Sequence, residues 1–509
     1  MSELVRVVLN TLLREDFLGI RSRGSVVDGR LLIDGATEIP VRPDGFLCDI
    51  AVAEPVVIHD GRRYTDLASV LALFRQRVDP ADLPGFDEFT RECHAAQATE
   101  RHQRAAPRPD RGPCTGMTAT LRYDGLAACA GHPVYPTANA RIGIGPADQS
   151  RYAPEHQATF APHWTGVPPD RVTGEGTLPN WWPTPAELGL PADHVPFPVH
   201  PLTGTGRPGR ILVRPTLSMR TVAVLADPHT HLKLPLPTSS LGALNRRTIK
   251  PGTLVDGAAT QRLLAAILRR EPAFADRILL ADEQTYRHTD DELLAFLVRR
   301  YPTDLATAEV VPLAALMVPA VVADLADRYA GGDRLALLAG YLAPLLDFQT
   351  TLLLRYGVAL ESHQQNVSLV LDRSGIRLLF KDNDGPRLRV DRPRAAMFAD
   401  RRILVSDTEP LIDVFTTITL HLCAAAIVFT LPEPDRRRGL TMIRDLLAAA
   451  IDRHPPSDDA KLLRASTLDA DRLPVKAMVT AGTLLTKQRS GATDINKFYL
   501  RDGPNYLSA

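Results

Sequence analysis

Polar residues lie at both open ends of one β-hairpin that the sequence predicts. In residues 361–384, ESHQQNVSLVLDRSGIRLLFKDND, two apolar runs are separated by a short loop that ends in glycine, which is typical of an antiparallel hairpin. A pairing of Asp372 with Ile376 would place Asn366 opposite Asp382. Directly opposed residues hold their Cβ atoms about 5 Å apart. An amide oxygen and a carboxylate at that spacing could bind one hard cation, such as the Mg²⁺ that accompanies a nucleotide triphosphate.

A short polar segment precedes this hairpin. Glu361, His363 and Gln365 alternate along it, so an extended backbone would turn all three side chains toward the same side. Two interpretations stay open from these residues alone. The segment is either a solvated loop in front of a surface hairpin or one half of a binding site.

A second predicted hairpin carries a different set of groups. In residues 217–240, LSMRTVAVLADPHTHLKLPLPTSS, a turn at DPHT would place Lys233 opposite Val224, on the sheet face that also carries Ser218 and Arg220. The other face presents three leucines and should join a core. A hydroxyl, a guanidinium and an ammonium on one face can bind a polyphosphate. The alternative is the charged outer face of a sheet.

Lysine is rare in this chain. It occurs at seven positions, so arginine supplies 59 − 7 = 52 of the basic residues. Because a generic surface cation in such a sequence is normally arginine, the few lysines are candidates for chemistry that needs a compact ammonium group. They are Lys233, Lys250, Lys381, Lys461, Lys476, Lys487 and Lys497.

The bulk composition argues against several classes of protein. The formal net charge of the 509 residues is zero, so no charge imbalance indicates nucleic acid or an anionic membrane as a partner. Five cysteines without close pairing favour a reduced, cytoplasmic compartment over a disulfide framework. Residues 1–17 predict an amphipathic helix and not a signal peptide. The apolar stretch 310–326 is interrupted by two prolines, which favours buried helices over a membrane span.

The elements that must position the polar residues predict an α+β protein with a helix-rich C-terminal half. Strand alternation marks residues 211–250, whereas residues 258–358 read as mostly helical, and long helices are predicted near 409–432 and 436–452. A chain of this length should divide into two or three lobes. We place these lobes at 1–113, 114–330 and 331–509, the first ending in a Pro- and Arg-rich connector, residues 99–113.

No single well-known motif explains these residues. The sequence contains no P-loop, no GxGxxG after a strand, no GxSxG elbow, no HExxH and no CxxC pair. Several weaker motifs in a fixed order do, however, resemble the NRPS-independent siderophore synthetases, the aerobactin-synthetase-like family. From about Leu121 to the C-terminus they are GHPVYPTANARIG (131–143), FPVHP (197–201), LSMRT (217–221), HLKLPLPTSS with NRRTI (231–249), the ESHQQN…KDNDG hairpin and LPVKA (473–477).

This resemblance implies an enzyme that uses ATP and Mg²⁺ to activate a carboxylic acid, citrate or a derivative, as an acyl adenylate. An amine or alcohol then takes the acyl group. The family fold is likened to a cupped hand with thumb, fingers and palm lobes, and many members are homodimers.

The resemblance also implies roles for individual residues. ATP phosphates would be bound by Ser218, Arg220, Thr221 and Lys233. The nucleotide site would be lined by Glu361, His363, Gln365 and Asn366, with Glu361 and Asp382 as Mg²⁺ ligands. Arg246 or its neighbour Arg247 would bind phosphate or the substrate carboxylate, and the substrate site would also include His132, Arg141 and Lys476. His132 is also the candidate for a general base.

Two positions depart from the family pattern GHPxHPxxKxRxG. Tyr135 replaces its second histidine and Asn139 its lysine, whereas His132 and Arg141 remain. The loss of an imidazole and a cation should weaken a pocket built for a highly charged tricarboxylate. The sequence therefore indicates ATP use more firmly than it indicates citrate.

Two other functions stay open. An asparagine followed across a hairpin by an aspartate also resembles the pair of metal-binding residues in kinase-like phosphotransferases, although no glycine-rich loop accompanies it. The replacements at Tyr135 and Asn139 would also suit a binding homologue with reduced catalysis.

Overall fold

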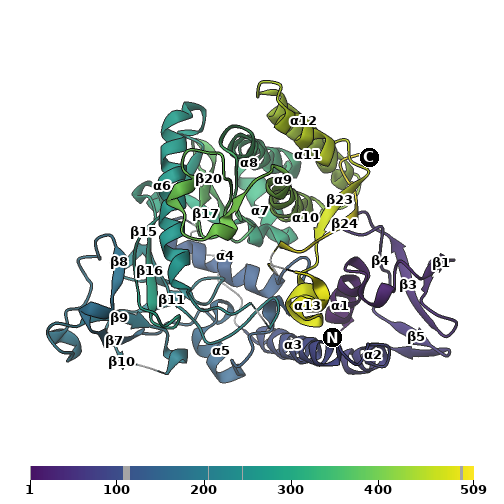
Figure 1. Ribbon diagram of the computed structural model, residues 1–509, viewed down its shortest axis with the longest axis horizontal. Helices are drawn as coiled ribbons and strands as arrows, with labels where there is room; N and C mark the ends of the chain where they lie inside the picture. The colour runs from purple at the N-terminus through teal and green to yellow at the C-terminus, as the bar shows by residue number, and fades with distance from the viewer. Residues whose placement is uncertain are drawn as a thin grey trace.

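The protein is described by a computed structural model that covers residues 2–106, 115–204, 206–243, 245–492, 494 and 497–508. Its elements gather into three lobes, with the N-terminal lobe at one end, a middle lobe at the other, and the helix-rich C-terminal half above both (Figure 1). The fold is therefore the α+β, multi-lobed arrangement that the sequence predicts. Part of the predicted connector, residues 107–113, lies outside the described residues, and so does the first lobe boundary. Residues 99–103 belong to a helix.

The N-terminal lobe joins three helices to one sheet. The helices are α1 (Ser2–Arg14), α2 (Leu67–Arg75) and α3 (Leu83–Gln103). The sheet has the order β1-β2-β3-β5-β6 with β4 paired to β3, and its strands are β1 (Ser25–Val27), β2 (Arg30–Leu32), β3 (Thr37–Pro43), β4 (Ile50–Val52), β5 (Val57–His59) and β6 (Arg62–Tyr64). The apolar face of α1 is buried, as its predicted amphipathic pattern requires.

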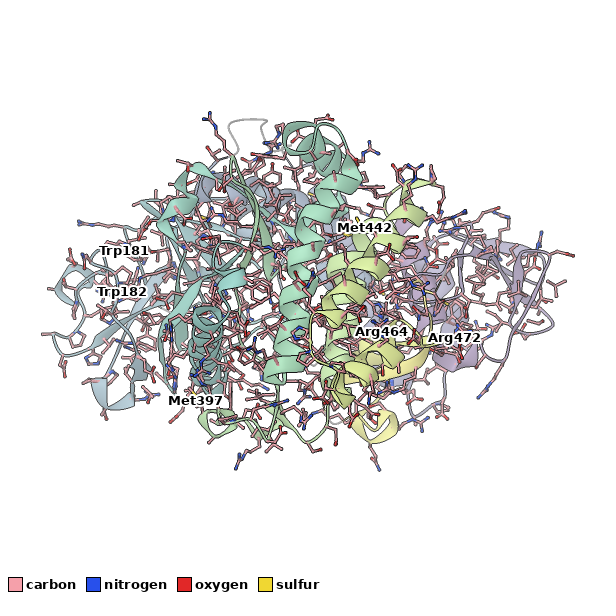
Figure 2. The ribbon with its side chains drawn as sticks, turned by 90° about the horizontal axis from the view of Figure 1, so that it is seen from above. Trp181, Trp182, Met397, Met442, Arg464 and Arg472 are labelled. Carbon is pink, nitrogen blue, oxygen red and sulfur yellow. The ribbon has the colours of Figure 1, made fainter. Side chains whose placement is uncertain are left out.

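The middle lobe is built on a six-stranded sheet of order β11-β12-β13-β16-β15-β8, beside a small sheet of order β10-β7-β9. The larger sheet consists of β11 (Val213–Pro215), β12 (Thr221–Val224), β13 (Asp227–Lys233), β16 (Ala295–Arg300), β15 (Asp282–His288) and β8 (Thr173–Glu175). The smaller one consists of β10 (Arg207–Pro208), β7 (His163–Val167) and β9 (Val195–Val199). Helices α4 (Met117–Ala130), α5 (Pro146–Tyr152) and α6 (Pro251–Arg270) accompany them. Trp181 and Trp182 lie at the far end of this lobe (Figure 2).

The C-terminal lobe contains a four-stranded sheet of order β14-β20-β19-β17. Its strands are β14 (Ile278–Leu280), β20 (Gly375–Phe380), β19 (Val367–Asp372) and β17 (Glu309–Pro312). The lobe also holds a small sheet of β18 (Val358–Ala359), β21 (Arg387–Arg389) and β22 (Leu404–Val405). Because β14 and β17 precede residue 330 in the chain, the predicted division at 330/331 does not coincide with a sheet boundary.

Long helices pack around this sheet. They are α7 (Pro319–Tyr329), α8 (Arg334–Tyr356), α9 (Glu409–Val414) with its continuation to α10 (Ala426–Val428), α11 (Asp435–Asp452) and α12 (Asp458–Thr467). Helices α8 and α11 lie side by side, with Met442 on α11 (Figure 2). By length and composition alone, α8 and the continuous helix Glu409–Val428 could cross a membrane, but they are 72% and 100% buried inside the protein, as core helices are.

One part of the predicted secondary structure is wrong. Residues 258–358 were expected to be mostly helical, yet β14, β15, β16 and β17 all fall within them. The misassignment is clearest at Ala295–Arg300, where five consecutive residues are buried and the side chains do not alternate between apolar and polar. A short, continuous apolar run cannot be distinguished from a buried helix by periodicity.

Both predicted hairpins form, each in a different register from the one expected. Strand β19 turns into β20 through two residues, so Asp372 pairs with Gly375 and not with Ile376. The tighter turn is held by the Asp372 carboxylate, which accepts a hydrogen bond from the Ser374 backbone at 2.8 Å. As a result Asn366 lies opposite Lys381, whose N–H donates to the Asn366 carbonyl at 3.0 Å, and it does not face Asp382.

The second hairpin differs because its turn lies at Leu225 and Ala226, so the predicted turn residues 227–230 begin strand β13. Val224 pairs with Asp227, and after a β-bulge between Ala223 and Val224, Lys233 pairs with Thr221 and not with Val224. The prediction for the opposite face is confirmed, because Leu232 and its neighbouring leucines are fully buried.

The C-terminal segment returns to the N-terminal lobe. Strands β23 (Arg472–Lys476) and β24 (Tyr499–Pro504) pair with each other, with α13 (Lys487–Ser490) between them. Glu15, at the end of α1, is 5% exposed and its carboxylate accepts hydrogen bonds from the backbone N–H groups of Val479 (3.2 Å) and Thr480 (2.7 Å). One buried side chain thus joins the two ends of the chain.

Replacing Glu15 by alanine should destabilise the protein. The change leaves two buried N–H groups without an acceptor, and we expect the free energy of unfolding to fall by about 1–3 kcal/mol. Urea unfolding followed by circular dichroism measures the change. The matched control is Glu3→Ala, because the Glu3 side chain on the same helix is 72% exposed, and its effect should stay within about 0.5 kcal/mol. Equal unfolding midpoints for the two variants would contradict the assignment.

Candidate active site

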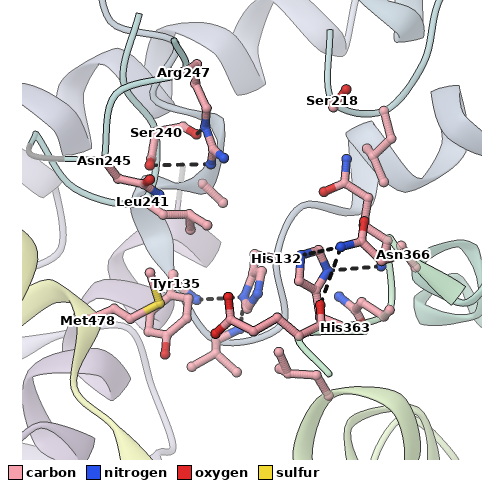
Figure 3. A pocket seen from close by; sticks show the side chains of 18 of the residues that line it. His132, Tyr135, Ser218, Ser240, Leu241, Asn245, Arg247, His363, Asn366 and Met478 are labelled. Carbon is pink, nitrogen blue, oxygen red and sulfur yellow. Dashed lines mark hydrogen bonds between the residues drawn. The ribbon is translucent and has the colours of Figure 1, made fainter. Parts of the chain in front are cut away.

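Most of the predicted site residues line one cavity of about 440 Å³. These are His132, Arg141, Ser218, Arg220, Glu361, His363, Gln365, Asn366, Asp382 and Lys476. Figure 3 shows how they converge: Ser218 and Asn366 lie along one wall, Arg247 and Ser240 along another, and His132 and Tyr135 below them. Elements of the middle and C-terminal lobes therefore meet at one site.

Three predicted residues do not line this cavity. Thr221 and Lys233 are buried beside it, and Arg246 is exposed to solvent. Its neighbour Arg247 does line the cavity. The alternation along the NRRTI segment turns one arginine inward and the other outward, so of the two arginines that the sequence left open, Arg247 is the one placed to contact a ligand.

Lys233 lies between two carboxylates of the cavity wall. Its ammonium group forms an ion pair with Asp382 and another with Asp384, the latter at 3.0 Å, and its side chain is 4% exposed. The cations Lys233, Arg299 and Arg220 hold the pKa of Asp382 well below its usual range, against the opposing effect of burial. Asp382 is therefore ionised, and Lys233 keeps the two aspartates close together.

The turn that carries Asp382 is held by a carboxylate from another strand. Glu283 in β15 accepts hydrogen bonds from the backbone N–H groups of Asp382 (2.7 Å) and Asn383 (3.0 Å). The same carboxylate forms a buried ion pair with Arg299 in β16, which also donates to Asp382 at 3.3 Å. Asp382 needs this support, because its φ of 62° is a left-handed conformation that L-residues adopt only at a cost.

The two predicted Mg²⁺ ligands differ in how well they suit a cation. Glu361 is engaged on one oxygen by two ammonium groups, Lys476 at 3.2 Å and Lys497 at 2.6 Å. Asp382 and Asp384 both face the cavity, share one lysine and each use only one carboxylate oxygen in that ion pair. Hard cations prefer such carboxylate oxygens. Two neighbouring carboxylates could thus hold a divalent cation at Asp382 and Asp384, whereas among the described residues no second carboxylate shares the lysines of Glu361.

The cavity also contains two arginines without a carboxylate partner. In the part of the chain that the structure describes, neither Arg220 nor Arg247 forms an ion pair, and Arg220 donates to the backbone carbonyl of Thr248 at 3.0 Å. Burial and the neighbouring Arg220 lower the pKa of Arg247 to about 10, which leaves it charged at neutral pH. Two adjacent guanidinium groups without a carboxylate partner could bind phosphate oxygens.

The cavity histidines are neutral. Burial, together with nearby cations, lowers the pKa of His132 to about 3 and that of His363 to about 4. The Nδ1 atom of His132 accepts hydrogen bonds from the backbone of Val134 (3.1 Å) and Tyr135 (3.3 Å), so the ring proton resides on Nε2. In this state His132 is a hydrogen-bond donor toward the cavity and not a general base.

Arg141 has its charge compensated. It forms a buried ion pair with Glu155, with one contact at 2.9 Å, and its side chain is 8% exposed. The two departures from the family pattern are also engaged with the protein, since Tyr135 donates to the Lys476 carbonyl at 3.3 Å and Asn139 to the Ala128 carbonyl at 3.4 Å. This wall consequently offers few free charges to a ligand.

Sequence reasoning missed four residues around this site: Glu283, Arg299, Asp384 and Lys497. Asp384 belongs to the quoted hairpin, and the rarity of lysine already pointed to Lys497. Glu283 and Arg299 could not be placed, because their strands lie in the region that was interpreted as helical.

The fold is that of solved siderophore synthetases. The petrobactin biosynthesis protein AsbB from Bacillus anthracis superimposes with a TM-score of 0.80 at 16% identity, covering 99% of this chain and 95% of AsbB. ATP-bound aerobactin synthetase IucA from Klebsiella pneumoniae gives 0.76 at 17% identity over 100% and 99% of the two chains. The K. pneumoniae IucC structure gives 0.73 at 20% identity over 100% and 98%.

Sequence comparison agrees with the fold. The IucA / IucC family model matches residues 119–207 and 202–318, and a second model, described as ferric iron reductase FhuF-like transporter, matches 336–491. Staphyloferrin B synthase from Staphylococcus aureus is 24% identical over 240 residues, which are 42% of this chain and 40% of that relative. Sequence and fold together relate this chain to the IucA/IucC family of NRPS-independent siderophore synthetases.

The state of His132 can be tested by pH titration. A pKa of about 3 keeps the imidazole neutral, with its proton on Nε2, from pH 8 down to pH 5. Nitrogen–proton correlation NMR should show no titration of this ring in that window, whereas in urea it should titrate near 6.5.

The lowered pKa of His132 also makes the stability of the fold depend on pH. Because the folded chain binds fewer protons than the unfolded chain between about pH 6.5 and pH 3, His132 should contribute stability that is lost as the pH falls through that range. Titration of the folded ring near pH 6.5 would show that the burial and hydrogen bonds described above are wrong.

Proposed function

We propose that this chain is an ATP-dependent ligase that adenylates a carboxylic acid and transfers the acyl group to an amine or alcohol, in the biosynthesis of a siderophore or a related product. The single observation that carries the proposal is that two neighbouring aspartates meet two guanidiniums, which have no carboxylate partner among the described residues, at one cavity. One set suits a divalent cation and the other suits phosphates. The names of the structural relatives, one of them solved with ATP, support the same chemistry.

In this proposal Arg220 and Arg247 bind phosphate oxygens of ATP and stabilise the charge that develops during transfer. Asp382 and Asp384 would hold Mg²⁺, which when bound neutralises charge on the phosphates. The substrate carboxylate attacks the α-phosphorus and pyrophosphate leaves, so no proton needs to be removed in that step. Much of the acceleration would come from holding both reactants in the correct orientation.

Further assignments belong to the same proposal. Citrate or a derivative is a candidate acid, and a homodimer in the cytoplasm is the expected state. The kinase-like alternative loses its geometric basis, because Asn366 lies opposite Lys381 and not opposite Asp382.

The products formed from labelled ATP distinguish the possible activities. With citrate, citryl amides, succinylated amines and amino acids as acids, and a panel of amines and alcohols as acceptors, we expect AMP and pyrophosphate. ADP would instead identify a phosphotransferase. ATP binding without turnover would identify a binding homologue.

A substitution at Asp382 tests whether this cavity carries the activity. Asp382→Asn removes one charge from the predicted cation site and from the partner of Lys233, so kcat/KM for ATP should fall at least about tenfold, or 1.4 kcal/mol. The control is Asp458→Asn, because the Asp458 side chain is fully exposed on α12. Circular dichroism checks that both variants fold. Full activity in folded Asp382→Asn would refute the assignment of this carboxylate.

A further inference from the structure

Two lysines share a single carboxylate at the edge of the cavity. The ammonium groups of Lys476, from β23, and Lys497, from the segment before β24, both donate to the same oxygen of Glu361. The side chains of the two lysines are 8% and 11% exposed. Among the described residues, Glu361 is the only carboxylate within ion-pair distance of either. The group therefore has a net charge of +1 in a largely buried place.

One lysine would be enough to neutralise Glu361. The second ammonium must be desolvated and lies beside a like charge, which is costly unless another anion compensates it. Glu361 offers the same oxygen to both ammonium groups, so one carboxylate charge is divided between two buried cations. A buried cation with incomplete compensation is suited to receive an anion from outside the protein.

The residues around the two lysines limit which kind of anion can bind there. Lys476, Glu361 and His132 line the cavity, and Lys497 lies at its edge through its ion pair with Glu361. His132 presents an N–H donor there, as argued above. Arg141 adds no free charge, because Glu155 compensates it. The lysine pair and one imidazole donor thus match one carboxylate, whereas the adjacent guanidiniums Arg220 and Arg247 suit a polyphosphate.

We propose that Lys497 and Lys476 together bind one carboxylate of the acid substrate, with Glu361 holding the two ammonium groups in position. This assignment rests on the proposed ligase function. It adds Lys497 to the recognition residues and identifies the favoured ligand as an acid that presents a single carboxylate to this wall. Glu361 then acts as a positioning residue for the lysines and not as a metal ligand.

The test separates binding of the acid from binding of ATP. It uses the full chain and the acid from the panel above that gives the fastest pyrophosphate release. Lys497→Met should raise KM for that acid at least tenfold while KM for ATP changes less than threefold. Lys497→Arg, which restores the cation, should recover most of the loss.

Lys487→Met is the matched control, since Lys487 lies in the same C-terminal segment and is exposed on α13. Its kinetic constants should equal those of the wild type. An unchanged KM for the acid in Lys497→Met, an equal rise in both KM values, or a fall in kcat alone would overturn the carboxylate assignment. A wild-type protein that releases no pyrophosphate with any acid would overturn the ligase function itself, and the carboxylate assignment with it.

Discussion

The cavity depends on one arrangement of charges, in which Glu283 and Lys233 hold the turn after β20. Glu283 accepts two backbone N–H groups of that turn, and Lys233 draws Asp382 and Asp384 together from the other side. Without these contacts the strained backbone at Asp382 would relax to a more common conformation. Because Glu283 and Lys233 come from the middle lobe and the turn from the C-terminal lobe, the same charges also join the two lobes at the site.

The remaining charges around the cavity differ in whether they are compensated. Arg141 is paired with Glu155, and this buried ion pair serves the structure and not a ligand. Arg220 and Arg247 have no carboxylate partner in the described part of the chain, and the lysine pair at Glu361 has one carboxylate for two cations. In a buried site, an uncompensated charge raises the energy of the empty protein, and a ligand of opposite charge removes that cost. The uncompensated cations therefore indicate where anions bind.

The sequence allowed the site to be predicted better than its geometry. Both hairpins could be anticipated, and most of the predicted site residues do line the cavity, because turn residues, alternation and the motif order are local features. The registers could not be anticipated. A two-residue turn at Arg373 and Ser374 shifts the pairing of the first hairpin, and a turn at Leu225 and Ala226, followed by a bulge, shifts that of the second. Arg299 was not predicted as a site residue for a related reason. Its strand is buried on both faces, so the sequence shows no alternation of apolar and polar residues that would identify it as a strand.

The rarity of lysine carried more information than any one motif. Lys233, Lys476 and Lys497 are withdrawn from solvent around the cavity, whereas Lys250, Lys461 and Lys487 are exposed. An ammonium group concentrates its charge on one nitrogen, so it can lie between two carboxylates, as Lys233 does, or share one with a second ammonium, as at Glu361. A planar guanidinium could not take the place of Lys233 between its two carboxylates without rearranging its neighbours. In a chain that otherwise uses arginine, a buried lysine marks a position where this compact geometry is needed.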